Sequence, residues 1–217
     1  MKNCVRKMMK LYLVTDKTWA IKQSLVAQVQ QALEGGVTCV QYREKNSNDV
    51  DVSEAEEIKD LCHKYNVPFI VNDDILLAKH LGADGVHIGQ DDTSLREARE
   101  MLGNDFIIGV SVHNVSEALK AVSDGADYLG VGAMFATNTK TDAELVSLEE
   151  LSQIRKAVQV PIVAIGGISS ENLVSLSPAN IDGIAVVSAI LASSDIKEAT
   201  LQLKELTEKM LTQINNS

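Results

Sequence analysis

A regular alternation of short apolar runs with longer amphipathic stretches limits the folds open to this chain of 217 residues. The short runs are rich in Val, Ile and Leu and almost continuously apolar, which is typical of parallel strands buried on both faces. Aromatic residues make up only 4% of the chain, so small aliphatic side chains must fill the core. We expect strands over Leu11–Thr15, Cys39–Arg43, Phe69–Asn72, Gly85–Ile88, Ile107–Val112, Tyr128–Ala133, Ile162–Ile165 and Ile184–Val187.

The stretches between these runs have the pattern of amphipathic helices. Ser53 followed by Glu56, and Ser116 followed by Glu117, predict two helix N-termini. Gly and Asn residues predict helix ends, because they tolerate the left-handed conformation found there. The predicted helix ends are at Gly35–Gly36, Asn66, Gly82, Gly103 and Gly125. The predicted helices include Ser24–Glu34, Val52–Tyr65, Ser94–Leu102, Val115–Ser123, Leu148–Val158 and Asp195–Ile214.

Eight alternations of strand and helix in this length predict an α/β fold, a single-domain (β/α)8 TIM barrel over residues 1–217. The alternative is an open, doubly wound sheet, which usually has a G-x-G-x-x-G turn after its first strand. Residues Val14–Lys17 have no such pattern. No Pro-, Gly- or Ser-rich linker divides the chain, so the barrel is favoured.

The formal net charge of −10 argues against nucleic acid and anionic membranes as partners. Anionic substrates would therefore need a local cluster of Lys and Arg, or a metal ion. The three cysteines have no C-x-x-C spacing, which favours a reducing compartment. A secretory signal peptide is disfavoured, because Asp16 and Lys17 interrupt the first apolar run. No stretch reaches transmembrane length. We expect a cytoplasmic protein that acts on small molecules, and leave open whether it forms a homo-oligomer.

Three polar residues share one face of the second predicted strand. Side chains alternate across a strand, so Gln41, Arg43 and Lys45 point one way and Val40 and Tyr42 the other. The outer face of a barrel strand packs on helices and should be apolar. An amide and two cations are therefore predicted on the inner, upper face of the barrel, where the active sites of such barrels lie.

Acidic residues follow the third and fourth predicted strands. Asp73 and Asp92 follow neighbouring strands, so their carboxylates could share one Mg²⁺, an ion held by one or two carboxylates plus substrate phosphate oxygens. We interpret Asp74 as a helix N-cap, whereas for Asp92 a cap and a metal ligand are equally compatible with the spacing. His87 has no second His at ligand spacing and is interpreted as structural rather than as a zinc ligand.

Later strands are followed by elements typical of anion sites. Ser111 places a hydroxyl near the end of the fifth strand, and residues 137–140 combine hydroxyls with a Lys. That loop could equally be ordinary polar surface. Gly166–Gly167 after the seventh strand and Val187–Ser188 after the eighth resemble the recurrent phosphate site of these barrels.

Seven short motifs follow one another at the strand ends. They are Q-Y-R-E-K at Gln41–Lys45, N-D at Asn72–Asp73, H-I-G-Q-x-D at His87–Asp92, G-V-S at Gly109–Ser111, T-x-T-K at Thr137–Lys140, I-G-G-I at Ile165–Ile168 and V-S-A-I at Val187–Ile190. Taken together, these motifs resemble the thiamine phosphate synthase family over nearly the whole chain, from Leu11 to Ile190. The sequence departs from the usual family pattern at Ala133 and Ala136, where the family has prolines.

The resemblance implies that 4-amino-2-methyl-5-hydroxymethylpyrimidine diphosphate is joined to a thiazole phosphate, plain or carboxylated, with release of pyrophosphate. It implies Mg²⁺ as the cofactor, bound by Asp73 and Asp92. The implied pyrimidine diphosphate site comprises Gln41, Tyr42, Arg43, Glu44, Lys45, Asn72, Ser111 and Lys140. The implied thiazole phosphate site comprises Thr137, Asn138, Thr139, Gly167, Val187 and Ser188.

On this interpretation, departure of the diphosphate limits the reaction, and no general base is needed because the thiazole nitrogen already carries a lone pair. Arg43, Lys45, Lys140 and Ser111 are the expected catalytic residues. Two alternatives remain. One is a metal-independent thiazole tautomerase of the same superfamily with His113 as its acid and base, and the other is a non-catalytic phosphate-binding barrel.

Overall fold

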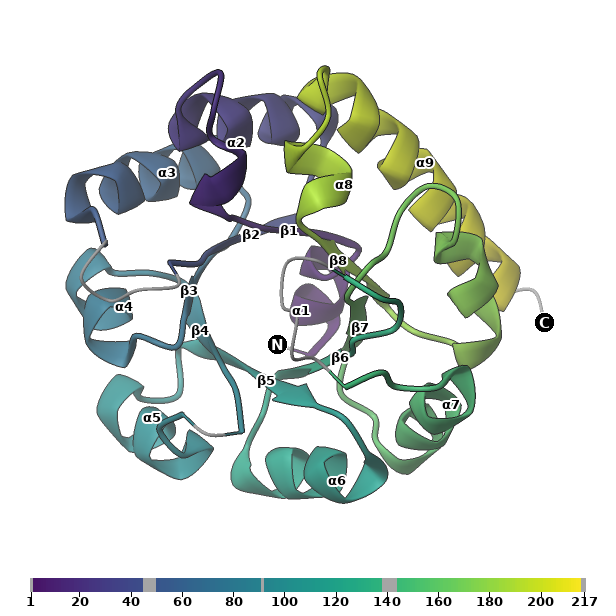
Figure 1. Ribbon diagram of the computed structural model, residues 1–217. Helices are drawn as coiled ribbons and strands as arrows, with labels where there is room; N and C mark the ends of the chain where they lie inside the picture. The colour runs from purple at the N-terminus through teal and green to yellow at the C-terminus, as the bar shows by residue number, and fades with distance from the viewer. Residues whose placement is uncertain (1, 45–49, 91, 138–143, 216–217) are drawn as a thin grey trace.

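The computed structural model of the protein describes residues 2–44, 50–90, 92–137 and 144–215. Within these residues, eight parallel strands pair in chain order, and β8 pairs with β1 to close the cylinder. Viewed down the barrel axis, the strands form an inner ring and the helices an outer one (Figure 1). The predicted (β/α)8 barrel is confirmed, and closure through β1 and β8 excludes the open sheet.

The strands begin within one residue of their predicted positions. The largest difference is at the end of β6, which stops before Ala133. There the backbone turns to pair with a later segment: the N–H of Ala133 donates to Glu144 O at 3.1 Å and its carbonyl accepts from Val146 N at 2.8 Å. The strands are β1 (Leu11–Val14), β2 (Cys39–Tyr42), β3 (Phe69–Asn72), β4 (Gly85–Ile88), β5 (Ile107–Val112), β6 (Tyr128–Val131), β7 (Ile162–Ile165) and β8 (Gly183–Val186).

The helices of the described residues lie between the strands and at both ends of the chain. They are α1 (Lys2–Met8), α2 (Leu25–Gly35), α3 (Val52–Lys64), α4 (Ile75–Leu81), α5 (Leu95–Leu102), α6 (Val115–Asp124), α7 (Leu148–Ala157), α8 (Ser188–Leu191) and α9 (Ile196–Asn215), with 3₁₀ helices η1 (Lys17–Trp19) and η3 (Leu173–Ala179).

Two predicted helix starts are wrong by two residues. The cap of α3 is Asp51, not Ser53, and the cap of α6 is Asn114, not Ser116. Each true cap has an extended backbone and accepts the N–H three residues later, which a residue already inside the helix cannot do. The predicted Gly ends are confirmed, with left-handed residues closing α2, α4 and α6.

The core has two layers, separated by the strands. Side chains that point outward pack against the helices and include Leu13, Val40 and Tyr42. Side chains that point inward fill the cylinder and include Tyr12 and Tyr128. This alternation follows from the period of two along a strand.

Helix α1 closes the lower end of the barrel and lies behind the ring of strands in Figure 1. Its residue Val5, together with Met9 just after it, belongs to the inner cluster. The Asp182 carboxylate, buried at this end, accepts hydrogen bonds from Arg6 and Arg155. Because this end is filled, a ligand must enter from the opposite end, where the strands finish.

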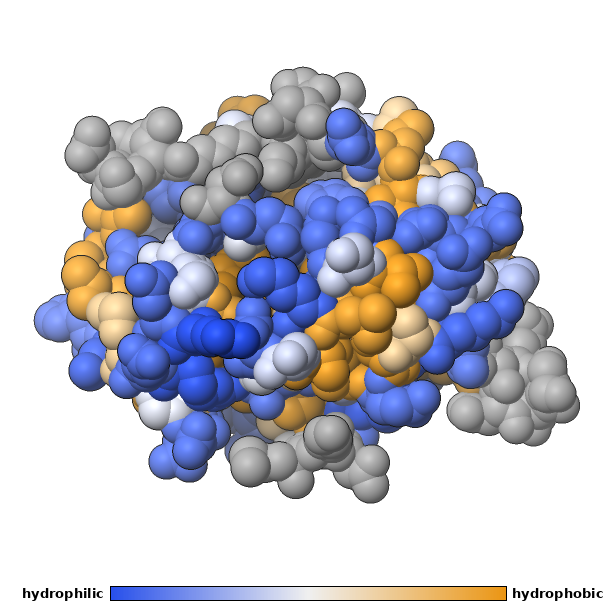
Figure 2. Space-filling model, turned by 90° about the horizontal axis from the view of Figure 1, so that it is seen from below, coloured by the Kyte–Doolittle hydropathy of each residue, from blue (hydrophilic) through white to orange (hydrophobic). Residues whose placement is uncertain are grey.

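The segment after β7 is a 3₁₀ helix, η3, rather than an α-helix. Pro178 lies inside it and has no N–H to donate to the preceding turn, which disfavours α-helical bonding. The side of the molecule seen in Figure 2 is largely hydrophilic, with an apolar patch near its centre. Over the described ranges, no helix has the length and apolarity needed to span a membrane.

Candidate active site

Polar residues gather at the open end of the barrel, where the strands finish. Arg43 directly follows β2, and Asn72 is the last residue of β3. The strand register then pairs Asn72 with His87 of β4, and Ser111 of β5 with Gly130 of β6. Residues far apart in the sequence are therefore brought to one rim, as the alternation of strand and helix predicts.

Asp73 and Asp92 form a carboxylate pair at this rim. The two side chains lie within hydrogen-bonding reach of each other, and the charge of Arg43 also acts on Asp73. Burial, followed by the hydrogen bond and negative charge of Asp92, raises the pKa of Asp73 to about 7. Arg43 and Asn72 oppose this shift. Because the two carboxylates repel each other when both are ionised, the pair is suited to share a proton or a cation.

The structure resolves which acids cap helices. The Asp74 carboxylate accepts a hydrogen bond from Leu77 N at 2.8 Å and caps α4, as predicted. Helix α5 is capped by Ser94, in a reciprocal arrangement with Glu97, and not by Asp92. Asp92 instead accepts the N–H of Gly89 at 2.6 Å. It therefore lies in the loop after β4 and reaches toward β3 without serving as a cap.

Arg43 is held by neighbours from β1 and its loop. Its guanidinium lies 4.0 Å from the Asp16 carboxylate, and its backbone N–H donates to Thr15 Oγ1 at 2.9 Å. Asp16 is buried, and its other oxygen accepts from the backbone and hydroxyl of Thr18. Our sequence analysis did not include Asp16 in the site. The signal was present, since Asp16 is a charged residue directly after a predicted strand.

A continuous chain of hydrogen bonds crosses the barrel interior beneath the rim. Gln41 Nε2 donates to Tyr12 Oη at 3.0 Å, and Tyr12 Oη lies 2.9 Å from Tyr128 Oη. Tyr128 Oη is 3.0 Å from His87 Nδ1, and His87 Nε2 is 2.9 Å from Ser111 Oγ. The chain therefore links two residues predicted to bind substrate, Gln41 and Ser111, through three residues that were not predicted to belong to the site.

The three interior members of this chain, Tyr12, Tyr128 and His87, are buried and electrically neutral. Burial lowers the pKa of His87 to about 4 and raises the pKa of Tyr12 and Tyr128 well above the usual value. Gly109 leaves room for the Tyr128 ring, because a Cβ atom there would lie 2.1 Å from that ring. Both ring nitrogens of His87 have side-chain partners, the hydroxyls of Tyr128 and Ser111.

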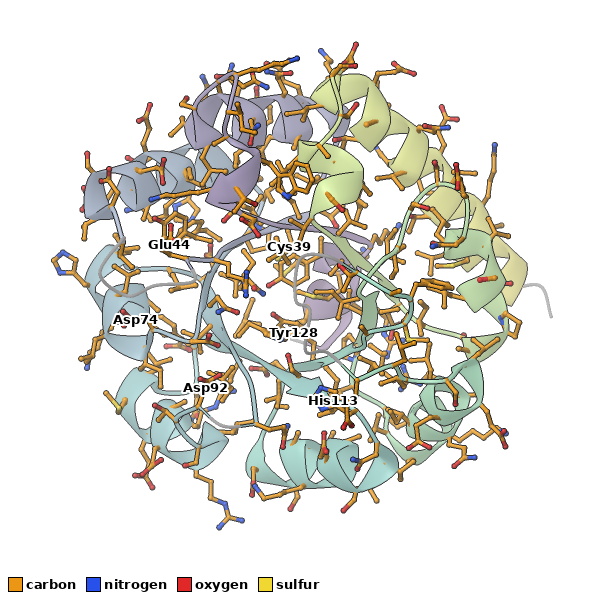
Figure 3. The ribbon with its side chains drawn as sticks, viewed as in Figure 1. Cys39, Glu44, Asp74, Asp92, His113 and Tyr128 are labelled. Atoms are coloured by element: carbon orange, nitrogen blue, oxygen red, sulfur yellow. The ribbon has the colours of Figure 1, made fainter. Side chains whose placement is uncertain are left out.

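Figure 3 separates the residues that face the interior from those that do not. Tyr128 and Cys39 lie within the ring of strands, whereas Glu44 lies outside it. The Glu44 carboxylate is 3.2 Å from Lys17 Nζ, which also pairs with Glu54 of α3 at 3.1 Å. The Glu44 side chain thus contributes to a contact between the β1 loop and α3 and lies away from the barrel interior.

The side chain of Tyr42 also faces away from the interior. Its ring packs against Phe69 in the outer layer, with the ring centroids 6.3 Å apart. The prediction that Val40 and Tyr42 point outward is therefore confirmed, and only the backbone of Tyr42 is left to contact a ligand at the rim. The reason is the same alternation that points Gln41 inward.

The glycine pair after β7 lies beneath the loop that follows β6. Gly167 has a φ of +63°, and a Cβ atom there would lie 2.5 Å from the carbonyl oxygen of Ala136. The glycine is therefore required by the close approach of two loops, whether or not a phosphate binds there. Thr137 is half-buried on the same loop, and Val187 and Ser188 begin α8.

Several predicted site residues lie outside the described ranges. They are Lys45, Asn138, Thr139 and Lys140. The usual family proline at position 133 is replaced here by Ala133, whose N–H donates to Glu144 O, a bond that proline cannot make.

His113, the acid and base of the tautomerase alternative, is engaged at the start of α6. Its Nδ1 lies 3.0 Å from Glu117 Oε2, and its backbone N–H donates to the same oxygen at 2.8 Å. Across the described residues, no group of three or more His, Cys, Asp and Glu side chains could hold a metal. A metal at the rim would therefore depend on the pair Asp73 and Asp92, with further oxygen atoms from ligands or water.

Comparison with known proteins agrees with this arrangement. Residues 11–190 match the family described as thiamine monophosphate synthase. The thiamine-phosphate synthase of Clostridium acetobutylicum is 47% identical over 204 residues, which is 94% of this chain and 97% of that protein. That of Ruminiclostridium cellulolyticum is 49% identical over 197 residues, covering 90% and 94%.

A solved structure of a related protein has the same fold. The thiamine phosphate pyrophosphorylase from Pyrococcus furiosus superposes with a TM-score of 0.86 at 37% identity, covering 95% of this chain and 99% of that one. With the strand-end motifs, the closed barrel and matches along nearly the full length in agreement, this chain belongs to the thiamine monophosphate synthase family.

Proposed function

We propose that this enzyme joins 4-amino-2-methyl-5-hydroxymethylpyrimidine diphosphate to 4-methyl-5-hydroxyethylthiazole phosphate, or its carboxylated form, and releases pyrophosphate. The observation that carries the proposal is the meeting of Arg43 with the acid pair Asp73 and Asp92 at the open end of the barrel. Cationic and metal-binding groups at one point suit a reaction in which negative charge builds on a leaving diphosphate.

The cationic side of the site would bind the diphosphate. The chain carries a net charge of −10, so an anionic substrate needs a local concentration of positive charge. Arg43 supplies it among the described residues, and Lys45 and Lys140 are proposed to complete it. Gln41 would orient the aminopyrimidine ring from the barrel interior, and Asn72 and Ser111 would bind the diphosphate from β3 and β5.

The donor set at the rim fits Mg²⁺. Two carboxylates are forced together there, and the raised pKa of Asp73 means that two neighbouring negative charges are unfavourable without a cation. Asp73 and Asp92 would hold the ion. When bound, Mg²⁺ would neutralise charge on the diphosphate oxygens.

The chemistry of joining requires little proton transfer. The bond between the pyrimidine methylene carbon and the diphosphate oxygen breaks, and the electron pair leaves with pyrophosphate. The electron-rich aminopyrimidine stabilises the carbocation-like methylene, and the lone pair of the thiazole nitrogen then forms the new C–N bond. The thiazole phosphate would be held by Thr137, Asn138, Thr139, Gly167, Val187 and Ser188.

The test is pyrophosphate release by the purified enzyme with both substrates, with each substrate alone, and with EDTA in place of Mg²⁺. We expect release only with both substrates and Mg²⁺. Asp73→Ala should abolish turnover at saturating Mg²⁺ while leaving a folded protein. Metal-independent isomerisation of the thiazole phosphate would support the tautomerase instead, and product binding without turnover would support a phosphate-binding barrel. Parallel assays with plain and carboxylated thiazole phosphate would establish the preferred substrate.

A cytoplasmic location is proposed on chemical grounds. Cys39 and Cys62, the cysteines whose side chains the structure describes, are buried free thiols. This matches the reducing compartment expected from the cysteine spacing.

A further inference from the structure

We propose that Tyr12, Tyr128 and His87 are positioning residues: their buried hydrogen-bond chain directs the Ser111 hydroxyl as a donor toward the anionic leaving group. This inference deepens the proposed function and rests on it. The chain spans the barrel from Gln41 on β2 to Ser111 on β5, and every link is between 2.9 and 3.0 Å.

The direction of the chain follows from counting hydrogens. Gln41 Nε2 donates to Tyr12 Oη, so the Tyr12 hydroxyl can donate to Tyr128 Oη. The Tyr128 hydroxyl can then donate to His87 Nδ1. A neutral imidazole that accepts at Nδ1 carries its hydrogen on Nε2, which therefore donates to Ser111 Oγ.

The hydroxyl hydrogen of Ser111 remains at the end of this hydrogen-bond chain. Ser111 Oγ accepts from His87, so its own hydroxyl hydrogen is not used within the chain and can point to a ligand at the rim. Because the buried His87 ring lies between the Tyr128 and Ser111 hydroxyls, it accepts from one and donates to the other, which gives the chain a single direction. Gln90 fixes the other side of the same residue, because its Nε2 donates to the Ser111 carbonyl at 2.6 Å.

The chain also sets the orientation of the Gln41 amide. With Nε2 committed to Tyr12, the amide oxygen is left as the acceptor for an exocyclic amino group on a bound ring. A single buried network would therefore coordinate the two ends of the pyrimidine diphosphate, with the ring at Gln41 and the leaving group at Ser111. Removal of any interior link would uncouple these two orientations.

A double-mutant cycle tests the inference. Tyr128→Phe keeps the ring and removes one hydroxyl, and should lower kcat about tenfold with little change in KM, because the hydrogen bond to the leaving group matters most as charge develops. Ser111→Ala should lower kcat about 100-fold, the usual effect of losing a donor to developing charge. In the Ser111→Ala background, Tyr128→Phe should have less than about a twofold further effect, because the hydroxyl it positions is gone.

Conservative replacement provides a second readout. His87→Gln has one acceptor and one donor and can reproduce the polarity of the neutral imidazole, so it should retain most of the wild-type kcat. His87→Leu should lose about as much as Tyr128→Phe. The matched control is Thr207→Val, which removes a buried hydroxyl that donates to Leu203 O within α9, and which should leave kcat and KM unchanged.

The outcomes are distinct. Turnover by the wild-type enzyme tests the proposed function alone, and the ratios among variants test the positioning role. An equal loss from Tyr128→Phe with and without Ser111 would overturn the inference, as would equal activity of His87→Gln and His87→Leu. If Tyr128→Phe does not fold, Tyr12→Phe breaks the chain one link earlier and is judged by the same criteria.

Discussion

Asp73→Asn should stabilise the metal-free protein at pH 8 while it abolishes activity. Asp73 combines two unfavourable features, a carboxylate next to Asp92 and a left-handed backbone with a φ of 60°. Asn removes the charge, and among residues other than Gly it tolerates the left-handed backbone best. The substitution therefore isolates the electrostatic component.

The magnitude follows from the pKa of Asp73, which rises from 3.8 to about 7 on folding. The folded protein then binds more protons than the unfolded chain between these values, so stability falls as the pH rises from about 4 to 7. That difference in pKa corresponds to about 4 kcal/mol without screening. Neighbouring groups partly desolvate the carboxylate, but the residue as a whole remains exposed, so solvent screening reduces this to about 1–2 kcal/mol.

Urea unfolding in EDTA at pH 4.5 and pH 8 measures the effect. We expect Asp73→Asn to gain about 1–2 kcal/mol at pH 8, or about 3–6 °C in Tm, and distinctly less at pH 4.5. The matched control is Asp74→Asn, which removes one negative charge at the adjacent residue and keeps an equally good N-cap. Its free energy of unfolding should change by less than about 0.5 kcal/mol.

Added Mg²⁺ should reverse the order of stability. At ten times its Kd, the ion would stabilise the wild type by about 1.4 kcal/mol and Asp73→Asn hardly at all. The reasoning would be refuted if Asp73→Asn destabilised the metal-free protein at pH 8, if its effect were equal at both pH values, or if Asp74→Asn matched it.

Three further substitutions separate activity from stability. Lys140→Ala should lower kcat at least about 100-fold with little change in the urea midpoint, and near-normal turnover at saturating Mg²⁺ would contradict its role with the diphosphate. Gly167→Ala should destabilise the protein by about 1–3 kcal/mol in urea unfolding, because the new Cβ would meet the Ala136 carbonyl oxygen and the backbone is left-handed. Met9→Ala, at the closed end of the barrel, should lower the free energy of unfolding by about 2–5 kcal/mol while kcat stays within about twofold; a large loss of kcat in folded protein would show that the two ends are coupled.

The features that sequence patterns predicted correctly are those set by local periodicity. Alternation along β2 predicted that Gln41 points inward and Val40 outward, and the positions of the strands followed from their apolar runs. Asp74 was correctly identified as a cap, because capping depends on residues within one helical turn.

Helix boundaries were predicted less accurately, because several neighbouring residues can cap the same helix. At α3 and α6 more than one residue could serve as the cap, and the sequence offers no means of choosing between Asp51 and Ser53. The backbone conformation decides, and that depends on how the preceding loop leaves its strand.

The hydrogen-bond chain inside the barrel could not be read from the sequence. Tyr12, His87 and Tyr128 belong to three different strands, and each by itself is an ordinary residue of an apolar run. Likewise, the ion pair of Glu44 with Lys17 and the closure of the lower end by α1 depend on packing between distant segments.

Local sequence patterns were enough to predict that this chain alternates strand and helix, which faces of its strands are buried, and which polar residues lie at strand ends, because each of these follows from the geometry of consecutive residues. Which of those residues meet depends instead on the folded barrel. Closure of the barrel places Asp73 against Asp92 and joins Gln41 to Ser111 through the interior, because hydrogen bonds and charge interactions depend on distances in space that no local pattern specifies.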